Sequence, residues 1–190
     1  MICIETPRLL LRTWTTQDLD PYWKLNQDSR VLEFLPGPLS KDEVAVFIDK
    51  MEKSFSANRY MLWAVEEKHS GELMGFVGLS SPAWEAAFTP CVEIGWRLGS
   101  AYWEKGYATE GALAVLTYGF DELGLTEIVS FTVPENVRSR RVMEKIGMIR
   151  DFKGDFLHPK LPLDHRLSKH VLYRLSREKT LHNIDLKVQE

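Results

Sequence analysis

The chain has 190 residues, of which 27% are charged, and a formal net charge of −3 at pH 7. Its length suits one domain with a sizeable core, and its charge balance gives no broad basic surface for a nucleic-acid backbone. No apolar run approaches the ~20 residues that span a bilayer, and the first five residues lack the pattern of a secretory signal.

Cys3 and Cys91 are the only cysteines, and they stand far apart without metal-ligand spacing. This usage is typical of a reducing compartment in which thiols stay free, although a disulfide between the two is the alternative. We therefore expect a cytoplasmic protein with no membrane partner and no direct nucleic-acid partner. We expect it to be a monomer or a homodimer.

The first half of the chain predicts two helices and three strands. Residues 8–14 are an apolar run typical of a buried strand. Residues 15–18 form a helix start with threonine as the N-cap, and residues 40–43 form a capping box before a helix of about four turns. Residues 60–67 and 72–79 are strand-like runs joined by a glycine-containing turn, which predicts a hairpin.

The second half alternates strands with helices. It predicts strands over 92–98, 127–133, 148–152 and 169–176, and helices over 106–123 and 136–146. Because hairpins flank an alternating middle, we expect a mixed α/β fold with helices on both faces of a central twisted sheet of about seven strands. The helical crossover between the fourth and fifth strands should make them parallel. We expect one domain over residues 1–176 and a polar tail, irregular or helical, over 177–190.

The turn Lys105-Gly106-Tyr107-Ala108 opens the helix that follows the strand at 92–98. The free N–H groups of a first helical turn and the helix dipole favour an anion there. Gly106 and Ala108 are small enough for a phosphate to reach the backbone. Small residues at a helix start also serve packing, so the turn alone leaves both interpretations open.

Five segments, taken in their order and spacing, resemble the GNAT acyltransferase superfamily. They are residues 6–12, 71–79, 92–96, 103–110 and 136–148. The likeness covers nearly all of residues 6–175, and the chain resembles in particular the ribosomal-protein N-terminal acetyltransferase branch, of RimJ and RimL type. It implies the GNAT fold, in which the fourth and fifth strands, here at 92–98 and 127–133, splay apart.

The resemblance implies transfer of an acetyl group from acetyl-CoA to a primary amine by direct attack on the thioester. The acceptor would be a protein N-terminus or a small amine. The alternative from another class is a non-catalytic acyl-CoA-binding or regulatory protein that keeps the fold but not the chemistry. No metal is expected, because the histidine spacings fit no common structural zinc site.

The coenzyme contacts that the resemblance implies follow the strand at 92–98. The pyrophosphate would lie on the loop Trp103, Glu104, Lys105, Gly106, Tyr107, Ala108 and Thr109. The backbone of Trp96, Arg97 and Leu98 would pair with the pantetheine arm, and an N–H near Trp96 or Arg97 would face the thioester oxygen. Glu104 departs from the pattern, because glycine is frequent there and an inward carboxylate would repel a pyrophosphate. We expect Glu104 to point to solvent.

Three more side chains match family positions, and Arg141 is a further candidate. Glu93 matches the general base of many GNAT enzymes, with an ion pair to an arginine such as Arg97, or water as the base, as the alternatives. Asn136 matches a coenzyme contact and equally suits a helix N-cap. Ser139 would lie near the coenzyme sulfur, as proton donor or simple hydrogen-bonding group. Arg141 belongs to a basic cluster that either contacts the 3′-phosphate or forms a solvated helix face.

The acceptor should enter beside the first two predicted helices and the loop at residues 80–90. Trp23, Trp84 and Phe88 are the predicted walls of its path.

Overall fold

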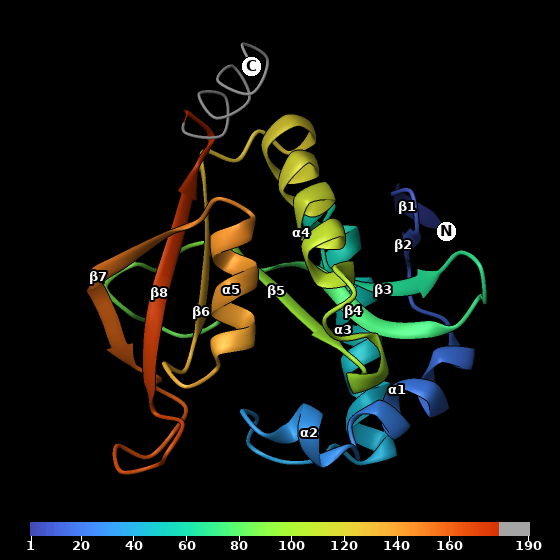
Figure 1. The fold of residues 1–190 in the computed structure, drawn as a ribbon, viewed down its shortest axis with the longest axis horizontal. Helices are drawn as coiled ribbons and strands as arrows, with labels where there is room; N and C mark the ends of the chain where they lie inside the picture. Colours follow the sequence, from blue (N-terminus) through green and yellow to red (C-terminus); the bar gives the residue numbers. More distant parts are fainter. Residues whose placement is uncertain (179–190) are drawn as a thin grey trace. The chain divides into compact units, whose positions relative to one another are not determined.

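The computed structural model describes residues 1–178, so most of the predicted tail over 177–190 lies outside the described residues. The chain divides into two compact units. Unit 1 comprises Met1–Ser80 and Gly95–Val115, and unit 2 comprises Ser81–Ile94 and the residues from Leu116 onward. Hydrogen-bonded neighbours give the strand order β1-β2-β3-β4-β5-β6-β8-β7. The strands and most of the helices are labelled in Figure 1. β5 (Glu93–Leu98) contributes residues to both units. The fold is mixed α/β as predicted, and residues 1–178 form a sheet of eight strands rather than about seven.

Unit 1 is mainly antiparallel. Its strands, besides its share of β5, are β1 (Ile2–Glu5), β2 (Leu9–Arg12), β3 (Leu62–Glu67) and β4 (Leu73–Ser80). Its helical segments are η1 (Thr16–Asp18), α1 (Leu19–Leu25), α2 (Ser29–Leu32), α3 (Lys41–Asn58), η2 (Ser100–Tyr102) and most of α4 (Tyr107–Thr117). Antiparallel pairing joins β1, β2, β3 and β4 in order. The predicted hairpin is confirmed as β3 and β4, whereas β1 and α2 are additions to the prediction.

The start of α3 follows from the capping box that the sequence predicts. The Ser40 hydroxyl accepts a hydrogen bond from the Glu43 N–H at 3.2 Å, and Glu43 Oε2 accepts from the Ser40 N–H at 2.8 Å. The two side chains thus satisfy N–H groups that have no partner inside the helix. The box also fixes the Glu43 carboxylate at the first turn of α3.

Helices cover both faces of β4 within unit 1. The ring centroid of Phe76 lies 5.9 Å from that of Phe47 on α3 and 6.2 Å from that of Tyr22 on α1. On the opposite face, α4 approaches Val77, because a Cβ added at Gly111 would lie 3.3 Å from a Val77 methyl group. Since successive strand residues point to opposite faces, α1 and α3 pack on one face and α4 on the other.

Gly75 lets β4 approach the end of β5. Its φ is +133°, and an added Cβ would collide with the carbonyl oxygen of Arg97. The Gly99 N–H donates to the Met74 carbonyl oxygen at 2.8 Å and completes the contact. Because no side chain fits at position 75, this glycine fixes where the backbone of Arg97 lies.

Unit 2 contains the parallel step of the sheet. Its elements are η3 (Tyr118–Glu122), β6 (Glu127–Thr132), α5 (Val137–Lys145), β7 (Ile149–Leu157) and β8 (Lys169–Ser176). β5 pairs with β6 in parallel, with Glu93 opposite Val129, as the crossover predicts. β8 pairs antiparallel with both β6 and β7. The predicted helix over 106–123 corresponds to α4 followed directly by the π-helical turn η3. β7 is longer than predicted.

β8 separates two different layers in unit 2. On one side the Tyr173 hydroxyl lies between two α5 residues, 3.3 Å from Arg140 Nε and 3.1 Å from Glu144 Oε1. Neighbouring aromatic rings form the other layer, which we call the aromatic cluster: Trp84, Phe88, Phe131, Phe156, His158 and His170. The loop at 81–92 therefore belongs to unit 2, where its two aromatic residues are part of this cluster.

Among residues 1–178, no helix is long and apolar enough to cross a bilayer. Cys3 and Cys91 are free and half-buried. Burial is the main reason that the pKa of Cys91 rises to about 11, which keeps this thiol protonated at neutral pH.

Candidate active site

The connector from β5 to α4 is built from local hydrogen bonds and two left-handed residues. The Trp103 indole N–H donates to the Leu98 carbonyl oxygen at 2.8 Å and ties the connector to the end of β5. Glu104 has φ +60° and Gly106 has φ +83°. Left-handed residues within a turn can orient successive N–H groups toward one anion.

The first turn of α4 begins directly after this connector. The Glu110 N–H donates to the Gly106 carbonyl oxygen at 3.0 Å and makes the first hydrogen bond of the helix. The N–H groups of the residues before Glu110 therefore have no partner within the helix. A Cβ added at Gly106 would meet only Arg8 Nη2, at 3.4 Å, and Gly106 is exposed. Packing therefore does not demand glycine here, and the backbone conformation does. The packing interpretation therefore does not account for Gly106, and the anion site stays a prediction.

Thr6 and Arg8 clamp the connector to the N-terminal strands. Arg8 Nε lies 2.6 Å from Glu110 Oε2, and Arg8 Nη1 donates to the Lys105 carbonyl oxygen at 3.0 Å. The Thr6 hydroxyl donates to Glu110 Oε1 at 2.6 Å. The Arg8 guanidinium also lies 4.3 Å above the centre of the Tyr107 ring. Five bonds and contacts of this kind on one short turn hold its N–H groups in place.

Glu110 is the centre of this clamp. Its burial alone would raise the pKa of the carboxyl group, but hydrogen bonds from Thr6 and from the backbone and side chain of Arg8 outweigh burial and lower the pKa. The carboxylate is therefore charged at neutral pH. It sits in the first turn of α4, where the helix dipole also favours a negative charge.

The side chains of Glu104 and Lys105 are exposed. An exposed Glu104 agrees with a carboxylate directed to solvent and leaves the backbone as the part of this residue available to a ligand.

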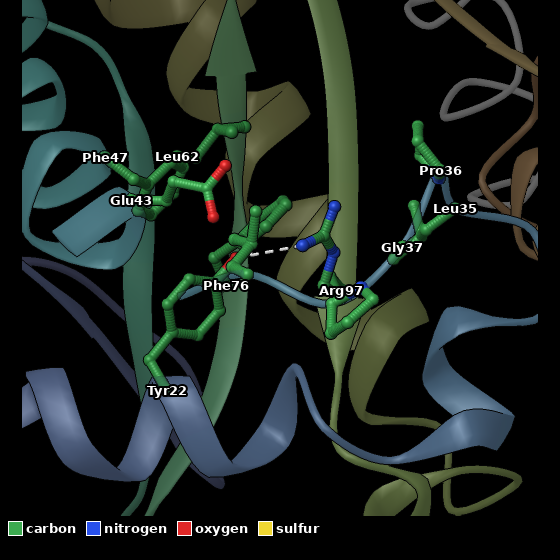
Figure 2. Close-up of a pocket in the computed structure, with 11 residues that line it drawn as sticks. Tyr22, Leu35, Pro36, Gly37, Glu43, Phe47, Leu62, Phe76 and Arg97 are labelled. Atoms are coloured by element: carbon green, nitrogen blue, oxygen red, sulfur yellow. Dashed lines mark hydrogen bonds between the residues drawn. The ribbon is translucent and has the colours of Figure 1, made fainter. Parts of the chain in front are cut away.

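A pocket of about 380 Å³ lies in unit 1, on the α1 and α3 side of the sheet (Figure 2). Its lining is mainly aromatic and aliphatic, with one carboxylate and one guanidinium. The lining residues are Tyr22, Leu35, Pro36, Gly37, Pro38, Leu39, Glu43, Phe47, Leu62, Phe76 and Arg97. The predicted wall Trp23 is not among them and instead contacts Lys41, whose Nζ lies 5.0 Å from a Trp23 ring centre.

Arg97 belongs to both the strand and the pocket. Its Nη1 donates to Asn26 Oδ1 at 2.6 Å and to the Tyr22 hydroxyl at 3.4 Å. Asn26 is fully buried, and its side-chain N–H donates to the Tyr22 carbonyl oxygen at 2.7 Å, which fixes the orientation of its amide. Burial raises the pKa of Tyr22, partly opposed by Arg97, so the phenol is neutral. The guanidinium is thus held by two neutral partners.

Glu93 opens β5 within unit 2. The Val129 N–H donates to the Val92 carbonyl oxygen at 2.9 Å, and the Ser130 hydroxyl donates to the Ile94 carbonyl oxygen at 2.9 Å. These bonds fix the backbone on both sides of Glu93, whose side chain is half-buried.

Asn136 and Ser139 lie together at the start of α5. Asn136 Oδ1 accepts from the Ser139 N–H at 3.2 Å, and Asn136 Nδ2 donates to the Thr132 hydroxyl at 3.1 Å. Asn136 is therefore the N-cap of α5, which was one of the two interpretations of the sequence. One amide hydrogen stays available for a second partner. The Ser139 hydroxyl forms no hydrogen bond to another residue between 1 and 178.

The basic residues of α5 divide between structural and exposed positions. Arg140 is held by the Pro134 carbonyl oxygen at 2.9 Å and by Tyr173. Arg141 is exposed. Of the two, Arg141 has the side chain that a phosphate in solution could reach.

A comparison with known protein families matches residues 8–149 to the family described as acetyltransferase (GNAT) domain. The chain belongs to the GNAT acetyltransferase family. It is 34% identical over 149 residues to YnaD of Bacillus subtilis (strain 168), an uncharacterized N-acetyltransferase, with 78% of this chain and 83% of that protein covered. This GNAT protein is an acetyltransferase.

Solved structures agree with this family. A GNAT-family acetyltransferase from Bacillus anthracis is 31% identical with a TM-score of 0.75, covering 94% of this chain and 99% of that chain. RimJ from Mycobacterium smegmatis, solved in complex with CoA-disulfide, is 20% identical with a TM-score of 0.72 and covers 90% and 83% of the two chains. The predicted likeness to the RimJ and RimL branch is thus confirmed at the level of the fold.

The GNAT structure groups the predicted site residues by unit. Unit 1 holds the stretch 96–98 and the connector 103–109, and unit 2 holds Glu93, Asn136, Ser139 and Arg141. Among residues 1–178, no three His, Cys, Asp or Glu side chains gather in a way that could hold a metal ion.

Sequence reasoning missed two features of the structure. The first is the clamp of Thr6 and Arg8 on Glu110. The segment at residues 6–12 contributed to the family resemblance, but nothing in the sequence indicated which residue it contacts. The second is the Arg97 side chain in its pocket, for which the sequence carries no local signal.

Proposed function

We propose that the chain is an N-acetyltransferase that moves an acetyl group from acetyl-CoA to a primary amine. The single observation that carries the proposal is the turn at 104–109, whose first three residues are exposed. It combines two left-handed residues, space above Gly106 and a clamp by Arg8. This is an arrangement in which backbone N–H groups can bind a diphosphate.

In this proposal the coenzyme follows β5. The pyrophosphate accepts hydrogen bonds from the N–H groups of 104–109, and the pantetheine arm pairs with the backbone of 96–98 as an added strand. An N–H of Trp96 or Arg97 stabilises the negative charge that develops on the thioester oxygen. Asn136 contributes its remaining amide hydrogen, and Arg141 is available to the 3′-phosphate.

The nitrogen of the acceptor loses two protons in the reaction, and the coenzyme sulfur gains one. The amine is mostly an ammonium ion at neutral pH, so Glu93, directly or through water, removes the first proton before the nitrogen attacks the carbonyl carbon. The C–N bond forms, the C–S bond breaks, and the nitrogen releases its second proton. The thiolate takes a proton from solvent or from Ser139, and the second proton of the nitrogen then restores the Ser139 hydroxyl. We include cytoplasmic residence in the proposal, because the thiols Cys3 and Cys91 are both free.

Gly106→Glu tests the coenzyme site. We expect calorimetry to show loss of acetyl-CoA binding by about 100-fold or more, because the side chain would crowd and repel the diphosphate. Gly124→Glu is the matched control, because Gly124 also has a left-handed φ, +67°, with nothing within 4 Å of an added Cβ. Equal affinity in both variants would contradict the assignment of the connector.

Thiol release from acetyl-CoA, followed over a panel of amines and peptides, tests the transfer itself. Release that depends on an acceptor supports the proposal. Tight coenzyme binding without release from any acceptor supports the alternative of a non-catalytic acyl-CoA-binding protein.

A further inference from the structure

The pocket around Arg97 has no part in the reaction as derived above. Its volume of about 380 Å³ is near the lower end of the range for small-molecule sites. One wall is aromatic, formed by Tyr22, Phe47 and Phe76, whose ring centroids lie 5.2 to 6.2 Å apart. A space of this size fits an amino acid or a short peptide and excludes a folded partner.

The positive charge in the pocket lacks a negative partner. Arg97 has five N–H donors, and its two hydrogen bonds go to the neutral oxygens of Asn26 and Tyr22. No carboxylate among residues 1–178 forms an ion pair with Arg97. A half-buried guanidinium with free donors favours a ligand carboxylate, which it can bind through two parallel hydrogen bonds.

Asn26 fixes the position of the Arg97 guanidinium. The Asn26 side chain is fully buried and uses both its oxygen and its nitrogen, one toward Arg97 and one toward the backbone of Tyr22. A buried amide with both ends satisfied has a single favourable orientation, so the Arg97 side chain is held in advance of any ligand.

Glu43 gives the pocket its second charge. Figure 2 shows the Glu43 carboxylate and the Arg97 guanidinium directed into the same space. Glu43 Oε2 accepts from both the N–H and the hydroxyl of Ser40, and the Ser40 N–H bond is the main reason that the pKa of Glu43 is lowered. The carboxylate is therefore charged at neutral pH. It favours an ammonium group and opposes a second carboxylate in the same pocket.

We propose that this pocket binds the acetyl acceptor, and that the acceptor is an amino acid or short peptide with a free carboxylate and an apolar side chain. Arg97 binds the carboxylate, and the rings of Tyr22, Phe47 and Phe76 contact the apolar group. The inference rests on the proposed function, because the backbone of Arg97 belongs to the stretch assigned to the pantetheine arm. One residue then serves the coenzyme through its backbone and the acceptor through its side chain.

Matched pairs of acceptors test the carboxylate. Thiol release from acetyl-CoA is measured with L-phenylalanine and L-leucine, with their carboxamides, and with a peptide whose C-terminus is amidated. We expect kcat/KM to be about tenfold or more higher for each free acid than for its amide, since the site rejects an acceptor that leaves Arg97 unpaired. A carboxylate makes the nearby amine harder to deprotonate, so chemistry alone would favour the amides.

Arg97→Gln tests the residue. We expect this variant to lose the preference for the free acids through a rise in KM, and to keep coenzyme affinity. Lys53→Gln is the matched control, because it removes one positive charge from an exposed position on α3 in the same unit. The control should keep the preference. An unchanged preference in Arg97→Gln, or best use of the amidated peptide by the parent protein, would overturn the inference.

A binding measurement separates this inference from the proposed function. N-acetyl-L-phenylalanine and its amide are titrated into the protein with coenzyme A, without any chemical step. Binding of the acid that is lost in Arg97→Gln supports the pocket even if no acceptor releases thiol, in which case the transfer proposal alone fails. Equal binding of acid and amide contradicts the carboxylate site whatever the enzyme turns over.

Discussion

The proton of the attacking amine is the first problem at the scale of single residues. Glu93 is the proposed proton acceptor, and Ser139 is the proposed donor to the thiolate. Asn136 makes a poor probe of the mechanism, because its side chain caps α5 and the loss of such a cap costs about 1 kcal/mol of stability. Ser139 makes a better one, because its N–H bonds to Asn136 and its hydroxyl bonds to no other residue between 1 and 178.

Glu93→Gln should slow turnover by about 100-fold or more, a factor at the lower end of the range for general-base catalysis. The Kd of acetyl-CoA should not change. The loss should shrink as the pH rises, since more of the amine is then already deprotonated. Rates measured across the pH range, with coenzyme binding followed separately, check this. Ser139→Ala is the comparison, with an expected loss of about tenfold or less. A parental rate for Glu93→Gln at every pH would leave water as the base.

At the scale of elements, the connector between β5 and α4 contains one residue, Glu104, that is unfavourable there in two ways. Gly106 takes its left-handed conformation freely, but for Glu104 the same region costs roughly 1–2 kcal/mol. The Glu104 carboxylate also places a negative charge in a loop proposed to bind a diphosphate. Both costs belong to the same side chain, and two substitutions separate them.

Glu104→Gln should lower the Kd of acetyl-CoA by up to about fivefold, because it removes the like charge, and this gain should vanish at high salt. Glu104→Gly should give the same gain in affinity and, in addition, raise the free energy of unfolding by about 1 kcal/mol. Calorimetry and chemical denaturation measure the two effects. Lys105→Gln is the control of opposite sign and should raise the Kd. Weaker binding by Glu104→Gln would mean that the carboxylate assists the coenzyme.

Elements with strong local signals were predictable from the sequence. The capping box located the start of α3, and the prediction for 169–176 matches β8. β1 was missed because four residues carry too little pattern. β7 runs beyond its predicted end because its pairing with β8 shifts register after Asp151 and resumes at Phe156. Local chemistry is therefore readable where side chains bond to their own neighbours in sequence.

The candidate site divides in the same way. The turn at 105–108 was predictable, since its glycine and the helix that follows are adjacent. The pocket was not, because Arg97 meets Asn26 and Tyr22 across 71 and 75 positions, and only tertiary packing brings them together. The clamp of Arg8 on Glu110 spans 102 positions and was hidden for the same reason.

At the scale of the whole molecule, several groups have a lower pKa in the folded chain. Burial lowers the pKa of His158 and His170 in the aromatic cluster. For Asp18 burial would raise the pKa, but hydrogen bonds from Arg12 and Thr15 outweigh it and lower the pKa. In each case the unfolded chain binds protons more readily than the folded chain, so acid favours unfolding.

The free energy of unfolding should therefore be greatest above pH 6.5, the ordinary pKa of histidine, and fall in two stages as the pH decreases. The first fall comes as His158 and His170 protonate in the unfolded chain. The second begins near pH 4.5 as carboxylates such as Glu110 do the same. Urea denaturation across pH 4–8 measures both. The double variant His158→Phe and His170→Phe keeps the rings and should flatten the first stage, and an unchanged slope there would contradict the assignment.

The clamp on Glu110 has a practical consequence for anyone who handles this protein. Thr6 and Arg8 lie between β1 and β2 and bond to Glu110 in the first turn of α4. Proteolytic trimming that removes these two residues would break the bonds. At the proposed coenzyme site, the damage would be measured as faster dissociation of acetyl-CoA from a turn about a hundred positions further along the sequence.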